Sequence, residues 1–155
     1  MSKTAIVTGA NRGIGRAIAL MLAKTGHDLC LLARDEAALG AVADECASNG
    51  VIVCPVHGEL TDEGFMDTAL ETATTRFGAI DVLVNNAGTA RHEAVQDADL
   101  GAWQDVMDVN FKAVVHLSAK VLPAMIARKE GAIVNISSIS GRNSPAGSAI
   151  YSASK

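Results

Sequence analysis

The chain has 155 residues, of which 49% are hydrophobic and only 3% aromatic, and its formal net charge is −4 at pH 7. This length suffices for one domain with a sizeable core, and the aliphatic composition suits a buried, mainly parallel sheet covered by helices. The acidic balance, with no basic block, argues against nucleic acid as a partner.

Cellular location is predicted from cysteine usage and from apolar runs. The three cysteines (Cys30, Cys46 and Cys54) are odd in number and irregularly spaced, which is not typical of a disulfide framework. No signal-like segment and no apolar run long enough to span a bilayer is seen. We therefore expect a cytoplasmic protein without a membrane partner, and no residues at metal-ligand spacing indicate a metal site.

The first distinctive stretch is the run TGANRGIG at residues 8–15, which follows the apolar residues 4–7. Gly9 can turn the chain with a positive φ, Gly13 lets backbone approach a ligand, and Gly15 allows close packing of helix on strand. A helix that begins here would point its free N–H groups and positive dipole end at a pyrophosphate. The alternative is that the glycines merely form a turn. The candidate ligand contacts are Gly9, Asn11, Arg12, Gly13, Ile14 and Gly15.

The next elements follow in strand–helix alternation. A helix is predicted over 14–25, with apolar residues at 14, 18, 21 and 22 on one face and Gly26 at its end. A strand follows over 28–33, and Asp35 is expected to cap a helix over 36–48.

Arg34 lies about 20 residues past the glycine turn, where dinucleotide folds contact the adenosine ribose. A guanidinium at this point suits a 2′-phosphate, which favours NADP; the alternative is a solvated loop residue. The neighbouring Asp35 keeps NAD possible because an acid here would bind ribose hydroxyls.

A third strand is predicted over 51–56, then a helix over 63–76 capped by Thr61 or Asp62. A fourth strand over 79–84 runs into the sequence NNAG at residues 85–88. The asparagine amides can tie the strand end to its neighbours, and Ala87-Gly88 leaves room for a flat ring against backbone. An ordinary turn is the alternative.

The last third of the chain contains two helices, over 99–109 and 111–128, with Asn110 at their junction. A fifth strand is predicted over 132–138. After a loop at 139–147, a helix is expected to begin near Ser148.

Tyr151 and Lys155 are four residues apart, so on a helix they share one face. A phenol alone holds its proton at neutral pH, and a nearby ammonium favours the phenolate form. Lys155 could also bind ribose hydroxyls. Ser138, thirteen residues before Tyr151, could hydrogen-bond a substrate oxygen, although Ser137 competes for that role. Each residue alone also fits packing or loop capping.

Together the G-x-x-x-G-x-G turn, the NNAG sequence, Asn110 and the Y-x-x-x-K pair resemble the classical short-chain dehydrogenase/reductase family. The resemblance runs from Met1 to Lys155, and more loosely it extends to β-ketoacyl-carrier-protein-reductase-like members. It implies an α/β, doubly wound Rossmann-type parallel sheet with strand order 3-2-1-4-5 in the part present.

The resemblance also implies a mechanism. Hydride passes between a nicotinamide cofactor, NADP(H) favoured and NAD(H) possible, and a small-molecule carbonyl or secondary alcohol. The implied catalytic residues are Asn110, Ser138, Tyr151 and Lys155, with Asn110 holding a water that contacts the lysine. The further cofactor contacts implied are Arg34, Glu59, Leu60, Asn86, Ala87 and Gly88, with Tyr151 and Lys155. Glu59-Leu60 stands where the family usually has Asp-Val or Asp-Leu, so its contact with adenine departs from the pattern.

Family members are longer, so residues 1–155 are expected to form a single dinucleotide-binding domain that is incomplete at its C-terminal side. The apolar run 132–136 suits a strand flanked on both sides rather than an exposed edge. The full-length protein is expected to be a homo-oligomer. The competing interpretations are a nucleotide-binding fragment or protein-interaction module without turnover, and a flavodoxin-like binding domain, which Ser138, Tyr151 and Lys155 disfavour.

Overall fold

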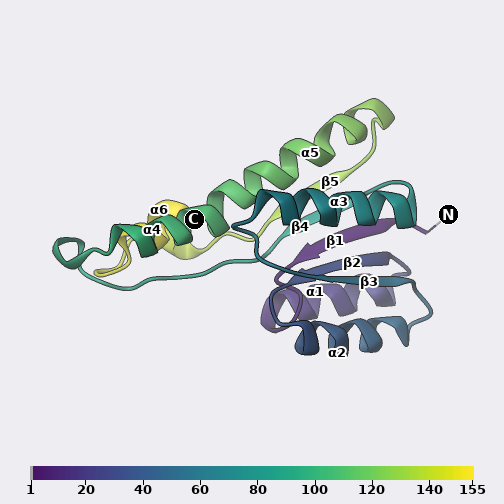
Figure 1. Ribbon diagram of the computed structural model, residues 1–155, viewed down its shortest axis with the longest axis horizontal. Coiled ribbons are helices and arrows are strands. Elements are labelled where there is room, and N and C mark those ends of the chain that lie inside the picture. Colours follow the sequence, from purple (N-terminus) through teal and green to yellow (C-terminus); the bar gives the residue numbers. More distant parts are fainter. Residues whose placement is uncertain (1) are drawn as a thin grey trace.

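A computed structural model describes residues 2–155 as a parallel five-stranded sheet in the order β3-β2-β1-β4-β5 (Figure 1). All four strand pairings are parallel. The predicted α/β class and strand order are therefore confirmed. The strands are β1 (Thr4–Thr8), β2 (Asp28–Ala33), β3 (Val53–His57), β4 (Val82–Asn85) and β5 (Ala132–Asn135).

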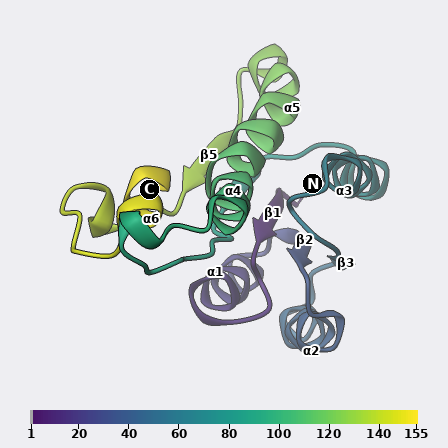
Figure 2. The same cartoon turned by 60° about the vertical axis from the view of Figure 1, so that its left-hand side comes forward.

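Helices cover both faces of this sheet, as parallel connections require. In Figure 2, α1 and α2 lie on one side of the strands and α3 and α5 on the other. The helices are α1 (Gly13–Lys24), α2 (Glu36–Ala47), α3 (Glu63–Phe77), α4 (Leu100–Met107), α5 (Ala113–Arg128) and α6 (Ala149–Ser154). Asp35 caps α2 and Asp62, rather than Thr61, caps α3, each accepting a backbone N–H bond.

The core divides into two apolar clusters because successive residues of a strand face opposite sides. Ile6 of β1 packs in the cluster under α3 and α5 with Leu83 and Leu117. Its neighbours Ala5 and Val7 pack in the other cluster, under α1 and α2. All five residues of β1 are buried, so the central strand fixes the position of the glycine turn that follows it.

The packing face of α1 is the predicted one only in part: Ile18 and Leu22 pack against the core as expected. Ile14 and Met21 are each 62% exposed, whereas the buried residues of α1 are small: Gly15, Ala19 and Ala23. Small side chains let the helix axis approach the sheet closely. Ile14 and Met21 therefore lie away from the core.

Strand β5 lies at the edge of the sheet, and three of its four residues are exposed. Val134 is 44% exposed. Within residues 2–155, the expectation of a strand flanked on both sides is therefore not met, because only β4 pairs with β5.

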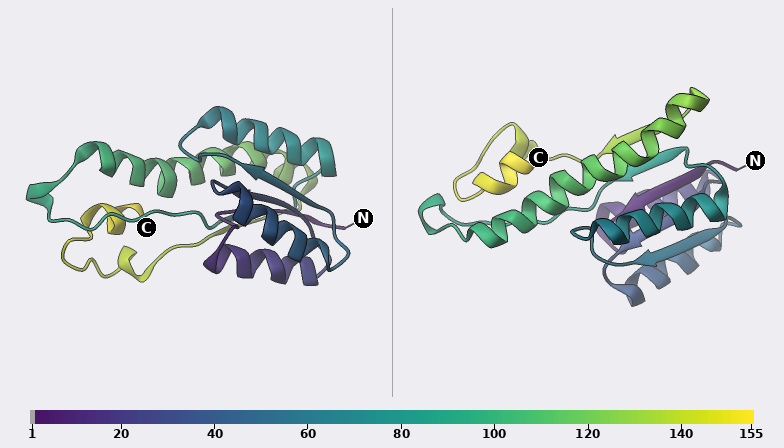
Figure 3. Two further views of the ribbon diagram at one scale, coloured as in Figure 1. Left: turned by 60° about the horizontal axis from the view of Figure 1, so that its bottom comes forward. Right: turned by 45° about the horizontal axis from the view of Figure 1, so that its top comes forward.

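A π-helical turn, Asp108–Lys112, joins α4 to α5 and contains Asn110, at the junction that the sequence predicted. Figure 3 shows α4 and α6 together at one end of the molecule, beyond the sheet. Contrary to the expectation that no apolar run is long enough to span a bilayer, the helical run Leu100–Arg128 passes that test by length and composition, with 28% of its window buried. A core helix can pass this test too, so the expected absence of a membrane partner stays a prediction.

Candidate active site

The glycine turn has the geometry that its sequence predicts. Gly9 and Gly13 have φ of +65° and +54°, a region that favours glycine. A Cβ on Gly15 would lie 2.2 Å from the carbonyl oxygen of Gly9, so only glycine fits there. The N-terminus of α1 is thereby held against the end of β1, with its first backbone N–H groups free to meet an anion.

The NNAG sequence is fastened to this turn through Thr8. The Thr8 hydroxyl accepts from the backbone N–H groups of Asn86 and Ala87 at 3.0 Å each. The Asn86 amide donates to the carbonyl oxygen of Thr8 at 2.9 Å. Thr8 was not among the candidates from the sequence; its signal is a buried hydroxyl at the carboxyl end of the central strand.

A cleft of about 1050 Å³ opens at the carboxyl ends of the strands. Such a crevice is where open α/β sheets bind ligands. Thr61, Thr89, Asp105 and Val109, which the sequence did not single out as ligand contacts, also line it, and so does Asp35, the acid that keeps NAD possible. The predicted residues that line it are Gly9, Asn11, Arg12, Gly13, Ile14, Gly15, Arg34, Glu59, Leu60, Asn86, Ala87 and Gly88.

At the β2–β3 end of the cleft, Arg34 and Glu59 face each other. The Arg34 Nη1 and Glu59 Oε1 atoms are 3.9 Å apart, and the two side chains are 72% and 55% exposed. An ion pair with this distance and this exposure contributes little to the stability of the fold. The guanidinium therefore remains available to an anionic ligand.

Lys155 and Asn110 meet beside Gly88. A Cβ on Gly88 would lie 3.1 Å from Lys155 Nζ and 3.4 Å from Asn110 Oδ1. Lys155 Nζ also donates to the carbonyl oxygen of Ile136 at 3.1 Å. The ammonium group thus lies next to the cleft, at the end of NNAG.

The Asn110 side chain is 5% exposed and fully engaged. Its Oδ1 accepts from the Thr89 N–H at 2.8 Å, and its Nδ2 donates to the Thr89 carbonyl at 2.8 Å. The same Nδ2 donates to Ser154 Oγ at 2.8 Å. In the same turn, hydrogen bonding to the Lys112 ammonium holds the pKa of the Asp108 carboxyl below its ordinary value.

Tyr151 lies on α6, half-buried, on the same helix as Ser154. Ser138 Oγ accepts from the Ser140 N–H at 3.1 Å, within its own turn. Ser137 is exposed, and its hydroxyl donates to the carbonyl oxygen of Lys155 at 2.7 Å. The structure brings Asn110, Lys155 and the cleft together, and it does not join Ser138 to Tyr151 by a hydrogen bond within residues 2–155.

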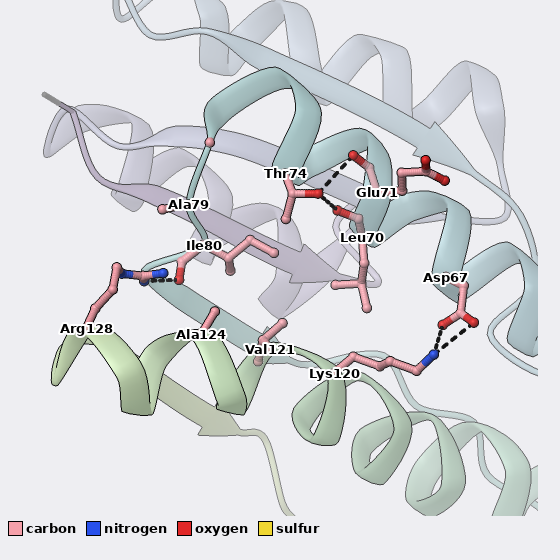
Figure 4. Close-up of a pocket in the computed structure, with 11 residues that line it drawn as sticks. Asp67, Leu70, Glu71, Thr74, Ala79, Ile80, Lys120, Val121, Ala124 and Arg128 are labelled. Atoms are coloured by element: carbon pink, nitrogen blue, oxygen red, sulfur yellow. Dashed lines mark hydrogen bonds and ion pairs between the residues drawn. The ribbon is translucent and has the colours of Figure 1, made fainter.

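A second cavity, of about 360 Å³, lies between α3 and α5 (Figure 4). Asp67 binds Lys120 across it, and hydrogen bonds from Lys120 and His116 lower the pKa of the Asp67 carboxyl. None of the predicted site residues lines this cavity. Over residues 2–155, no three His, Cys, Asp or Glu side chains gather as metal ligands would.

Comparison with known proteins identifies relatives of this chain. It is 37% identical over 156 aligned residues to the 3-oxoacyl-(acyl-carrier-protein) reductase FabG of Staphylococcus aureus strain Mu50, covering 100% of this chain and 63% of that protein. The chain thus spans less than two thirds of the length of that relative.

Solved structures agree with this likeness. A metagenomic short-chain oxidoreductase in complex with NADP superposes with a TM-score of 0.95 at 38% identity, covering 100% of this chain and 71% of the other. NAD⁺-bound xylitol dehydrogenase gives 0.93 at 32% identity, covering 99% and 59%. The family profile described as short chain dehydrogenase matches residues 3–155. The chain belongs to the short-chain dehydrogenase family.

Proposed function

We propose that this protein is an oxidoreductase that transfers hydride between a nicotinamide cofactor, NADP in preference to NAD, and a carbonyl or secondary alcohol. The observation that carries the proposal is the position of Lys155. Its ammonium lies beside Gly88 at the edge of the cleft, and it follows Tyr151 by four residues at the end of α6. A base-assisting cation, a phenol and a dinucleotide-sized cleft therefore occur together.

The cleft fits a dinucleotide by shape and by chemistry. The close approach of Gly15 to Gly9, and of Gly9 to Ala87, packs the glycine turn, the start of α1 and the NNAG sequence against one another along the cleft. Gly9, Gly13 and the start of α1 would hold the pyrophosphate, and Asn86, Ala87 and Gly88 would lie along the nicotinamide half. When bound, the nicotinamide supplies or accepts the hydride.

The protein's own residues would handle the proton. Tyr151 donates it to the substrate oxygen during reduction and takes it back during oxidation. Lys155 favours the phenolate by its charge and holds ribose hydroxyls. Ser138 orients the substrate oxygen. Asn110 holds the segments that carry Lys155, and its place in a π turn suits a bound water.

The preference for NADP rests on Arg34 and Arg12. Both guanidinium groups border the cleft, and the only acid paired with Arg34 in residues 2–155 is 3.9 Å away. A phosphate offers arginine a charge-assisted bidentate contact that a ribose hydroxyl cannot. Asp35 is the acid that would favour NAD.

The names of the relatives support a proposal for the substrate class. The named ones include a 3-oxoacyl reductase, a xylitol dehydrogenase and an L-sorbose reductase from Gluconobacter frateurii complexed with NADPH and L-sorbose. Each of these names denotes the interconversion of a carbonyl and an alcohol, and the substrates they name differ in the rest of the molecule. We propose a small-molecule carbonyl or secondary alcohol as substrate, in a cytoplasmic homo-oligomer.

The test is Tyr151→Phe in the protein that carries this sequence, assayed with NADPH and a panel of ketones. Loss of the phenolic proton should lower kcat by about 100-fold or more, since general acid–base groups contribute that much. The Kd for NADPH should stay unchanged. Turnover within a few-fold of the original would reject the role of Tyr151. Cofactor binding without turnover in the original protein would instead support a nucleotide-binding module.

A further inference from the structure

We propose that His92 is a positioning residue for Tyr151, acting through Ser148 at the start of α6. The inference rests on the proposed function. His92 lies in the loop after the NNAG sequence, outside the residues that line the cleft. Its role would therefore concern the phenol and the substrate side rather than the cofactor.

Two consecutive residues of this loop bond to two consecutive residues before α6. The His92 Nδ1 atom is 3.0 Å from Ser148 Oγ. The Glu93 N–H donates to the carbonyl oxygen of Gly147 at 2.9 Å. The His92 and Tyr151 rings also lie 6.2 Å apart between centroids, tilted by 56°. The loop thus forms a two-point contact with the segment that leads into the Tyr151 helix.

The loop has its own anchor on α4. The Glu93 side chain is 16% exposed, and its carboxylate accepts from Trp103 Nε1 and from the Asp99 N–H. Arg91 Nε donates to the same carboxylate at 3.3 Å. Because Trp103 lies on α4, these bonds to Glu93 fix the loop, and with it His92, relative to α4.

The contact matters because α6 has only six residues. A helix this short has little stability of its own, so its direction depends on contacts at its ends. The far end is held by the bond from Asn110 to Ser154. At the near end Ser148 is buried, and its hydroxyl bonds His92 instead of capping a helix N–H. Tyr151, three residues later, takes its orientation from both ends.

Three variants separate the hydrogen bond from ring packing. His92→Asn keeps a polar atom at the place of Nδ1, while His92→Phe keeps a ring beside Tyr151 and loses the bond. Ser148→Ala removes the partner. We expect His92→Phe and Ser148→Ala each to lower kcat about 5- to 10-fold, the effect of one hydrogen bond. His92→Asn should restore most of kcat, and the Kd for NADPH should change less than about twofold in every variant.

A second readout does not depend on turnover. Tyr151 is the only tyrosine of these 155 residues. With selectively labelled tyrosine, its ring signal by NMR is the one that disappears in Tyr151→Phe. His92→Phe and Ser148→Ala should shift or broaden this signal, and His92→Asn should not. The double variant with His92→Phe and Ser148→Ala should lose no more kcat than either single variant, because both remove the same contact.

Additive losses in the double variant would overturn the inference, as would an unchanged Tyr151 signal together with an unchanged kcat in His92→Phe. These outcomes differ from a failure of the proposed function. If Tyr151→Phe keeps its activity, the chemistry is misassigned. If Tyr151→Phe is inactive while His92→Phe matches the original protein in kcat and ring signal, only the role of His92 fails.

Discussion

Asn110 and Ser154 are joined by a buried hydrogen bond of 2.8 Å from Nδ2 to Oγ. This bond links the π turn between α4 and α5 to the last turn of α6. Since Ser154 stands between Tyr151 and Lys155, the asparagine controls the place of both. The family resemblance implies a water held at this asparagine. In the structure the polar atoms of its side chain form hydrogen bonds with Thr89 and Ser154.

We expect Asn110→Ala to lower the free energy of unfolding by about 2–3 kcal/mol, because Thr89 and Ser154 would lose buried partners. Activity should fall at least about 10-fold, since Lys155 loses its support. Asn143→Ala, at an exposed loop position, is the matched control and should change stability by less than about 0.5 kcal/mol. Denaturant unfolding measures the free energy of unfolding of both variants, and equal stability of the two would contradict the expectation.

Features fixed by neighbouring residues were predictable from the sequence. The glycine turn and the Asp35 cap follow from local backbone chemistry, whereas the strand order came from the family resemblance. Bonds between distant segments were not predictable. The His92–Ser148 contact spans 56 residues and the Asn110–Ser154 contact 44, and each depends on how segments distant in the sequence pack together rather than on spacing.

Two of the four positions predicted for the buried face of α1, 14 and 21, were wrong for a related reason. Hydrophobicity ranks Ile14 and Met21 above Ala19, yet close helix–sheet contact selects small residues. The edge position of β5 was not predictable either. Its apolar residues predict a neighbouring strand on each side, and residues 2–155 contain only one, β4.

Gly15 and Gly40 form a matched pair for testing the cofactor cradle. A Cβ on Gly15 would meet the Gly9 carbonyl oxygen at 2.2 Å, while one on Gly40 would meet nothing within 4 Å. Both glycines are helical, so Ala should stabilise at position 40 by about 0.5–1 kcal/mol. Gly15→Ala should instead lower Tm and weaken NADPH binding at least about 10-fold, because the turn must move. Titration calorimetry measures NADPH binding and dye-free thermal unfolding measures Tm. A Gly15→Ala protein that binds NADPH normally would show that the turn tolerates a Cβ at this position.

Arg34→Asp tests cofactor preference. The original protein should bind NADPH about 10- to 100-fold more tightly than NADH, the effect of a charge-assisted contact. The substitution should remove this preference or reverse it, because an acid repels the 2′-phosphate and accepts from ribose hydroxyls. Arg76→Asp, with the same charge change at the end of α3 and away from the cleft, should leave the ratio unchanged. Equal or tighter binding of NADH by the original protein would refute the assignment of Arg34.

Exposed apolar residues on α5 predict that the protein forms a homo-oligomer. Val115, Leu122 and Ile126 fall on one side of α5 by their spacing and are 51%, 43% and 64% exposed, and Phe111, in the π turn just before α5, is 53% exposed. An apolar stripe of this kind marks an interaction surface. A closed symmetric dimer would bury the same stripe from two copies at once. We therefore expect the protein to be at least a dimer that uses α5.

Leu122→Glu combined with Ile126→Glu should shift the protein to monomers, since two carboxylates would be buried without partners. Met21→Glu, on the exposed flank of α1 at 62%, is the control and should leave the mass unchanged. Sedimentation velocity measures the masses, with thermal unfolding to check that the variants fold. If the original protein is monomeric, or instead floats with phospholipid vesicles through this helix, then the α5 stripe is not a surface between copies.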